Sequence, residues 1–172
     1  MIRDAETWIV QVHKNLYHVL NYLNDNDNIT DLTIDKYDKM DGLDFLPTTF
    51  FDSRCYKRLK KGIFNIKCDI KDAQFLESKA MKLKIYGPMV GEIAINTKLR
   101  NWCTRQNEDI YLELRDGFNP SREVEHKVVR YNLPFVRWEV MDNRLEWDFG
   151  NRAVLDVTYN SVVFRTISGI EE

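Results

Sequence analysis

Three carboxylates on one short segment are the residues of this chain best suited to metal binding or acid–base chemistry. Glu139 precedes, and Glu146 and Asp148 follow, Asp142-Asn143, a pair that tolerates the left-handed backbone of a tight hairpin turn. Folding there places Glu139 opposite Glu146, and two facing carboxylates raise the pKa of one of them. Such acids can hold a divalent cation or donate a proton. The solvated face of an ordinary sheet carries the same charges, so a hydrolytic site is only one of two interpretations.

The residues around that turn predict a β-hairpin with one apolar face and one charged face. Aromatic and aliphatic residues alternate with charged ones on both sides of the turn. The predicted opposite pairs are Val140 with Leu145, Trp138 with Trp147, Val136 with Phe149, Arg137 with Asp148 and Glu139 with Glu146. The last pair opposes two like charges, which costs about 0.2–1 kcal/mol. The pattern therefore predicts the register of the two strands but does not indicate a particular enzymatic reaction.

A basic segment from Ser53 to Lys67 contains no acidic residue and is the candidate nucleic-acid surface. Its cations neutralise phosphates, and the interleaved Tyr56 and Phe64 can stack on bases. The candidate binding residues are Arg54, Lys57, Arg58, Lys60 and Lys61. The preceding segment, residues 25–44, is acidic and offers ion pairs to these cations. A nucleic-acid surface and an internally paired surface are therefore both open.

Other recognised chemistry is missing from the sequence. No phosphate-binding loop, dinucleotide fingerprint, nucleophile elbow or zinc-protease motif is present. Residues 25–28 begin like a calcium loop, but Thr30 and Lys36 stand where glycine and glutamate are required. His13 and His18 are five residues apart and would not share a helical face. We therefore expect no metal site and no cofactor.

The three cysteines indicate a reducing environment. Cys55, Cys68 and Cys103 cannot all pair within one chain, and none has zinc-site spacing. Basic neighbours of Cys55 could lower its pKa and favour the thiolate. No catalytic signature accompanies it, so we expect Cys55 to be an ordinary surface thiol.

Hydrophobic periodicity predicts secondary structure over most of the first hundred residues. Residues 4–24 place apolar side chains at steps of three and four, with Asp4 as the N-cap, so a long amphipathic helix is expected. A short strand is expected within 29–37, a strand from Phe64 to Ile70 and a short helix within 71–82. The pattern of residues 90–103 fits either strand or helix.

After Asp109 the pattern predicts consecutive strands. Alternation occurs in 110–115, 123–128, the hairpin, 153–159 and 162–167, with short turns between them. Strands joined by short turns are antiparallel neighbours. We therefore predict a single α+β domain, residues 1–172, in which the amphipathic helix packs on a mostly antiparallel C-terminal β-meander of residues 109–168. A mixed acidic and basic middle, residues 25–105, separates the two.

Composition excludes several functional classes. The 172 residues carry a net charge of -2 and are 44% hydrophobic, so a general polyanion binder and a disordered chain are both unlike this sequence. No apolar run is long enough to span a membrane, and we expect no signal peptide. We expect no membrane partner and an intracellular protein, either cytoplasmic or assembled in a virus particle. The abundance of Asn, Asp, Lys and Ile suggests an AT-rich coding genome, as in many phages.

The chemically capable residues are scattered, which favours binding over catalysis. Our leading hypothesis is a non-enzymatic protein interaction or assembly protein, such as a viral structural component, with a protein partner or self-association. Nucleic-acid binding through residues 54–67 is the alternative, and a carboxylate- or metal-dependent hydrolase is the second alternative. Aromatic residues that are expected to be exposed anchor such interfaces. The interface candidates are Trp102, Phe118 and Phe135, with Tyr111 and Pro134 beside them.

Overall fold

The computed structural model describes residues 6–12, 16–24, 28–36, 45–103, 109–116, 137–141, 144–148, 153–158 and 161–166. Ten strands of these residues form one sheet, and five helices accompany the strands of the first two thirds. The helices are α1 (Leu16–Asn24), α2 (Thr48–Phe51), α3 (Arg54–Arg58), α4 (Asp72–Glu77) and α5 (Glu92–Cys103). The strands are β1 (Glu6–Val12), β2 (Ile29–Lys36), β3 (Phe45–Leu46), β4 (Lys61–Cys68), β5 (Lys82–Tyr86), β6 (Tyr111–Arg115), β7 (Arg137–Met141), β8 (Arg144–Asp148), β9 (Ala153–Thr158) and β10 (Ser161–Thr166).

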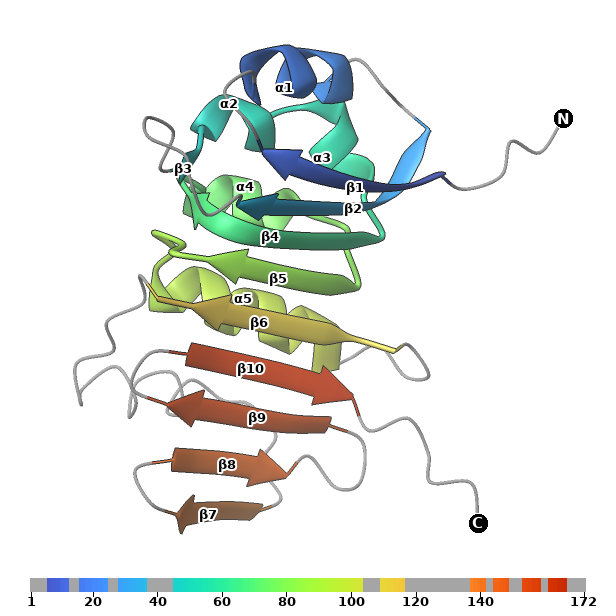
Figure 1. Ribbon diagram of the computed structural model, residues 1–172. Coiled ribbons are helices and arrows are strands. Elements are labelled where there is room, and N and C mark those ends of the chain that lie inside the picture. The colour runs from blue at the N-terminus through green and yellow to red at the C-terminus, as the bar shows by residue number, and fades with distance from the viewer. Residues whose placement is uncertain are drawn as a thin grey trace, which may run out of the picture.

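The sheet has a parallel part followed by an antiparallel part. Its order is β1-β2-β4-β5-β6-β10-β9-β8-β7, with β3 beside β4 (Figure 1). Strands β1, β2, β4, β5 and β6 run parallel in chain order, and each is followed by helix before the next. The last four strands are antiparallel to their neighbours. The chain therefore winds as a succession of strand–helix units and ends in an antiparallel meander.

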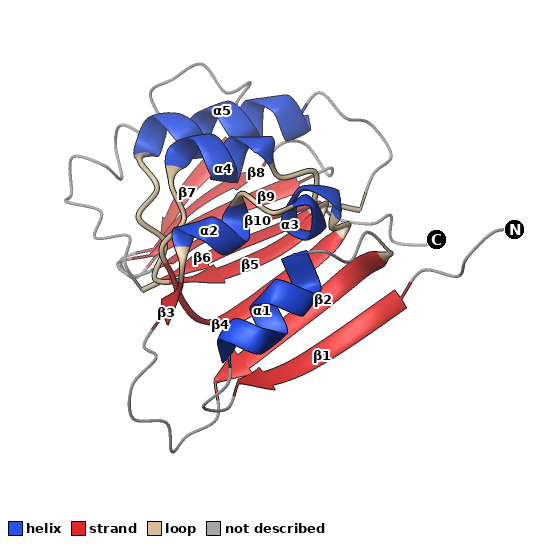
Figure 2. Ribbon diagram, turned by 90° about the horizontal axis from the view of Figure 1, so that it is seen from above, coloured by secondary structure: helices blue, strands red, loops and turns tan. Residues whose placement is uncertain are grey.

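All five helices lie against the same face of the sheet (Figure 2). Between the helices and the sheet lies the core, in which aliphatic and aromatic side chains of both layers are buried. Figure 1 views the opposite face, over which no helix of the described residues passes. We call this the open face.

The sequence of β4 shows why the two faces differ. Along Lys61–Cys68 the burial of side chains alternates, with Gly62, Phe64, Ile66 and Cys68 buried and the residues between them exposed or half-buried. Because successive side chains of a strand point to opposite faces, the buried series meets the helices and the other series belongs to the open face. The same alternation holds in β5 and β9.

The expected fold class, a helix packed on an antiparallel meander, is wrong. The chain forms a mixed α/β sheet whose first half is parallel, and residues 25–105 supply most of its central strands and helices. Each connection between parallel strands crosses the helical face and is long enough to contain a helix, as parallel pairing requires. Short connections indicate antiparallel pairing only for the C-terminal strands, and that pairing does not extend to the first half of the sheet.

The expected single helix over residues 4–24 is also wrong. Residues Glu6–Val12 form β1, which pairs parallel with β2, and only Leu16–Asn24 is helical. The side chains of Trp8 and Val10 pack against the core whereas Thr7 and Ile9 are exposed, which is the two-residue period of a strand. The β-branched residues Ile9, Val10 and Val12 favour that extended backbone.

Several local predictions are confirmed. The strand expected within 29–37 is β2. The segment 90–103, whose pattern fits either strand or helix, contains the helix α5. The short helix of 71–82 is present as the shorter α4. Strands β7 and β8 pair in the predicted register, with Arg137 opposite Asp148, Trp138 opposite Trp147, Glu139 opposite Glu146 and Val140 opposite Leu145. The predicted strand of 123–128, the hairpin turn and the pair of Val136 with Phe149 lie outside the described residues.

Candidate binding face

Cations gather on the open face over four neighbouring strands. The side chains of Leu83, Ile85, Leu112, Leu114, Val162 and Phe164 are buried on the helical side of β5, β6 and β10. The residues between them therefore belong to the open face. We define the basic stripe as Lys61 and Lys67 of β4, Lys82 and Lys84 of β5, Arg115 of β6 and Arg165 of β10.

Strand register brings the members of the basic stripe together. Lys61 is the Cα partner of Lys82, which is in turn the partner of Tyr111. Tyr111 is the partner of Arg165 on the far side of β6. Neighbouring strands are about 4.8 Å apart, so these four positions form one row across the sheet.

Glu113 is the only acid on the open face of these four strands, and it is buried although no helix of the described residues covers it. Its side chain is 3% exposed and lies between Tyr111 and Arg115 on the same face of β6. The Tyr111 hydroxyl donates to Glu113 Oε2 at 2.6 Å, and Lys84 Nζ lies 3.7 Å from the same oxygen. Arg115 Nε pairs with Oε1. The carboxylate therefore holds three neighbouring side chains in fixed positions.

The Glu113 carboxylate keeps the Tyr111 hydroxyl protonated and fixes it as a hydrogen-bond donor. Burial, together with its hydrogen bond to Glu113, raises the pKa of Tyr111 to about 12, while Arg115 and Arg165 oppose the shift. A phenol that donates to a carboxylate resists deprotonation because ionisation would place two anions in contact. At neutral pH Tyr111 is therefore a fixed donor, and its ring remains half-buried on the open face.

Stability should fall at alkaline pH because of this tyrosine. The folded pKa is above the unfolded value of 10.0, so the contribution is present below pH 10 and is lost as the pH rises towards 12. Urea unfolding of the parent at pH 7, 10 and 11 should therefore give a declining free energy. Tyr111→Phe should decline less between pH 10 and 11. An equal decline in the two proteins would contradict the assignment.

Acidic residues border the basic stripe on both sides. Strand β2 carries Asp31 and Asp35 on the open face, and Asn65 of β4 donates to Asp35 Oδ1 at 2.5 Å. On the other side Asp156 of β9 lies opposite Val163 of β10. The open face thus carries bands of negative, positive and negative charge.

The basic segment expected to bind nucleic acid is divided between two faces. Arg54, Lys57 and Arg58 belong to α3 in the helical layer, where Lys57 Nζ pairs with Glu77 at 2.8 Å. Lys60 immediately precedes β4 and Lys61 is its first residue, and of the five cations Lys61 alone belongs to the open face. The rest of the stripe is not apparent as a cluster in the sequence, because its cations lie on separate strands; the local signal is the alternation of cations with buried apolar residues, as at Lys82 and Lys84 of β5.

The hairpin carboxylates occupy the outer strands of the sheet. The backbone places Glu139 opposite Glu146, and Glu146 opposite Asp156 of β9, so three acids share a row. The side chains of Glu139, Glu146 and Asp148 lie outside the described residues. Where side chains are described, no group of three His, Cys, Asp or Glu residues could hold a metal ion.

The aromatic interface candidates have different surroundings. Trp102 is 4% exposed and its ring lies 6.3 Å from that of Phe164, so the expectation that it is exposed is wrong. It lies on the inner side of α5, where the helix period directs it to the sheet. Tyr111 is half-buried. Phe118 and the Pro134-Phe135 corner lie outside the described residues.

The cysteine expected at the surface is buried. Cys55 is 0% exposed because α3 directs it into the core, although its neighbours on the same helix are basic. Cys68 is also buried, and desolvation raises the pKa of its thiol well above its usual range. Neither thiol is in a disulfide bond within the described part of the chain. Sequence neighbours on a helix point in other directions, so they do not define the environment of a side chain.

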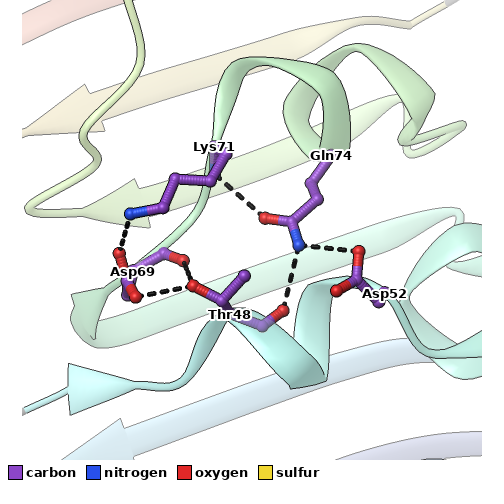
Figure 3. Close-up of polar contacts among 5 residues, drawn as sticks. All are labelled: Thr48, Asp52, Asp69, Lys71 and Gln74. Atoms are coloured by element: carbon purple, nitrogen blue, oxygen red, sulfur yellow. Dashed lines mark hydrogen bonds and ion pairs between the residues drawn. The ribbon is translucent and has the colours of Figure 1, made fainter.

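A second polar cluster joins the loops at the carboxyl end of β4 (Figure 3). The Thr48 hydroxyl lies 2.6 Å from Asp69 Oδ2 and 2.7 Å from the Asp69 carbonyl oxygen. Lys71 Nζ pairs with the other oxygen of Asp69. These two contacts hold the pKa of the Asp69 carboxyl below its ordinary value. Each group in the cluster has a protein partner, which indicates a structural role.

Gln74 is the centre of that cluster. Its Nε2 donates to the Thr48 carbonyl at 3.1 Å and to Asp52 Oδ1 at 2.7 Å, while Oε1 accepts from the Lys71 amide at 3.0 Å. Gln74 therefore links α4 to α2 and closes the first turn of its own helix.

Gln74→Ala should destabilise the fold by about 1–3 kcal/mol, because the residue is 6% exposed and its three hydrogen bonds would be lost. Each hydrogen bond contributes about 0.5–1.5 kcal/mol to stability. Urea unfolding measures the change. Lys79→Ala, at an exposed position just beyond the same helix, is the control and should change the free energy by less than about 0.5 kcal/mol.

None of the described helices is sufficiently long and apolar to cross a membrane. Comparison of the chain with protein-family models, curated proteins and solved structures gives no match. The functional interpretation therefore depends on the open face and its charges.

Proposed function

We propose that this chain is a non-enzymatic protein-binding domain whose partner lies on the open face of the sheet. The observation that carries the proposal is the one-sided arrangement of the helices, which leaves a broad face of β2, β4, β5, β6 and β10 uncovered by any described helix (Figure 2). Stacked strand–helix units commonly use such an extended surface for recognition.

The composition of the open face supports a protein as partner. Two half-buried tyrosines, Tyr86 and Tyr111, lie among the lysines and arginines of its centre, and Ile63 is half-buried beside Lys84. Tyrosine and arginine are enriched in protein interfaces. Bands of opposite charge suit a partner with complementary bands, since charge pattern provides specificity and orientation.

Catalysis is a weaker interpretation of the same residues. The buried carboxylate Glu113 accepts a hydrogen bond from Tyr111 at Oε2 and forms ion pairs with Lys84 and Arg115, while its Oε1 accepts no hydrogen bond from the described residues. The ion pairs hold the carboxylate against two cations, whereas a general base must be free to take a proton from the substrate. The hydrolase alternative assigns the chemistry to the hairpin acids Glu139, Glu146 and Asp148. Their side chains lie outside the described residues, and the contacts of Glu113 do not involve them.

Selection from a random dodecapeptide library displayed on phage tests the proposal. The immobilised full chain should enrich peptides whose binding is weakened by Ile63→Glu on the open face. Ile93→Glu is the matched control, because Ile93 belongs to α5 in the helical layer and is 72% exposed. Enriched peptides that bind the Ile63 variant as well as the parent would contradict the proposal, as would failure to enrich any peptide.

Self-association through β1 is a second candidate function, because β1 is an edge strand of the sheet. Strand β1 pairs only with β2 among the described strands, and Ile9 on it is 71% exposed. An uncovered edge strand can pair with another chain. Light scattering over a concentration series should then give an oligomer that Ile9→Lys weakens. A monomer at every concentration would count against this assembly role.

A further inference from the structure

We propose that the basic stripe binds an extended, acidic segment of the partner protein. This inference depends on the proposed function and names the chemistry of the ligand. The stripe contains six cationic side chains, and Glu113 is the one acid on the open face of the same four strands. A carboxylate-rich peptide provides the complementary charge.

Two of the cations are positioned before any ligand arrives. Lys84 and Arg115 both contact the buried carboxylate of Glu113, so their heads are held at the centre of the stripe. Arg115 is nevertheless 56% exposed along its side chain, so it keeps surface for a ligand. Prior positioning reduces the entropy lost on binding.

The remaining cations surround this centre. Lys61 and Lys67 are exposed at the two ends of β4, and neither is in an ion pair within the residues that the structure describes. Lys82 is 46% exposed, although its Nζ contacts Asp109 at 2.5 Å. Four cations therefore lie on the two adjacent strands β4 and β5.

The dimensions of the stripe suit a short peptide. From Lys61 to Lys67 a strand extends about 20 Å at about 3.3 Å per residue. Four adjacent strands span about 15 Å between the first and the last. An extended segment of about six residues covers either dimension.

The acidic borders argue against nucleic acid as the ligand. Asp31 and Asp35 on β2, and Asp156 on β9, lie on either side of the stripe. A polynucleotide longer than the stripe would bring phosphates against these carboxylates, whereas a short acidic segment ends within it. The acids themselves can meet basic residues that flank the acidic segment of a partner.

Fluorescence anisotropy with three labelled probes tests the inference. The probes are a hexapeptide of alternating Glu and Ser, which matches the length of the stripe, its Lys and Ser counterpart, and single-stranded dT12. The full chain should bind the acidic peptide most tightly, and raising the salt from 50 to 300 mM should weaken that binding. Lys61→Glu/Lys67→Glu should weaken the affinity for the acidic peptide at least about tenfold, because the two new carboxylates repel those of the peptide.

The matched control carries the same change of charge in the helical layer. Arg54→Glu/Lys79→Glu alters two exposed cations away from the stripe and should leave the affinity within about twofold of the parent. Should the charge-reversed stripe variant fail to fold, Lys61→Gln/Lys67→Gln removes the same cations and should still weaken binding. Equal affinity of the stripe variant and the control variant would overturn the inference.

The other outcomes separate this inference from the proposed function. Tighter binding of dT12 than of the acidic peptide would overturn the inference in favour of nucleic acid. Library peptides that bind the open face but lack acidic residues would also overturn it, while leaving the protein-binding function intact. Acidic library peptides that compete with the labelled acidic probe would support both.

Discussion

Lys98→Ala should lower the free energy of unfolding by about 3–5 kcal/mol, through lost charge-assisted hydrogen bonds and a new cavity. Lys98 is 3% exposed on α5, and its Nζ donates to the carbonyls of Phe75 at 2.8 Å and Ser78 at 2.9 Å. These carbonyls lie at the end of α4, where a cation also opposes the partial negative charge of the helix terminus. The ammonium lies 5.0 Å from the centre of the Phe75 ring.

Comparison of Lys98→Met with Lys98→Ala separates the stabilisation due to the ammonium from the stabilisation due to side-chain packing. Methionine keeps most of the side-chain volume but cannot donate to the two carbonyls, so its loss of stability should be smaller than that of alanine by about 1–2 kcal/mol. Urea unfolding of the three proteins at neutral pH provides the comparison. A loss below about 1 kcal/mol for alanine would show that water replaces the ammonium without penalty.

Phe64→Ala should cost about 3–5 kcal/mol, the usual effect of truncating a buried aromatic residue. Phe64 is 0% exposed on β4 and belongs to a cluster of four rings. Its ring centre lies 5.7 Å from that of Phe50, 6.0 Å from Phe51 and 6.2 Å from Tyr56. The cluster joins α2 and α3 to the sheet, so its loss should loosen that part of the helical layer.

A substitution at Gly62 tests the position of the Phe64 ring independently. A Cβ at Gly62 would lie 3.0 Å from two atoms of the Phe64 ring, so Gly62→Ala forces the ring to move. In a double-mutant cycle the cost of Gly62→Ala should be smaller in the Phe64→Leu background, because leucine leaves room for the methyl group. Strictly additive losses in urea unfolding would contradict direct contact between the two positions.

Local patterns in the sequence predicted local structure well. The hairpin pairing of Trp138 with Trp147 and of Val140 with Leu145 is confirmed, because the turn position and the alternation together determine the register. The strand β2 and the helix α4 also follow from short-range patterning, although α4 ends earlier than expected. These elements need no knowledge of distant partners.

Ambiguous periodicity explains the error at the amino end. Trp8, Val12 and Leu16 are spaced like one face of a helix, but Trp8, Val10 and Val12 are spaced equally well like one face of a strand. The pairing of β1 with β2 decides between them, and that pairing joins residues more than twenty positions apart. Tertiary contact therefore overrides the helical pattern.

The candidate site was even less predictable than the fold. The basic stripe joins Lys61 to Arg165, and only the parallel register of β4, β5 and β6 and the antiparallel return of β10 bring them together. The densest run of positive charge along the chain is residues 54–67 instead. Most of those cations lie on α3 or at a strand end, away from the surface that the sheet creates.

The reversal of direction at β10 limits how the sheet can grow. Strand β10 occupies the outer edge of β6, and Thr166 fixes the pair through its amide at 3.0 Å from the Ile110 carbonyl. A further parallel unit cannot be added beyond β6, because its hydrogen-bonding edge is already taken. Longer versions of this architecture would have to insert their extra units before β6. The meander therefore sets the end of the stack, as terminal caps do in repeat proteins.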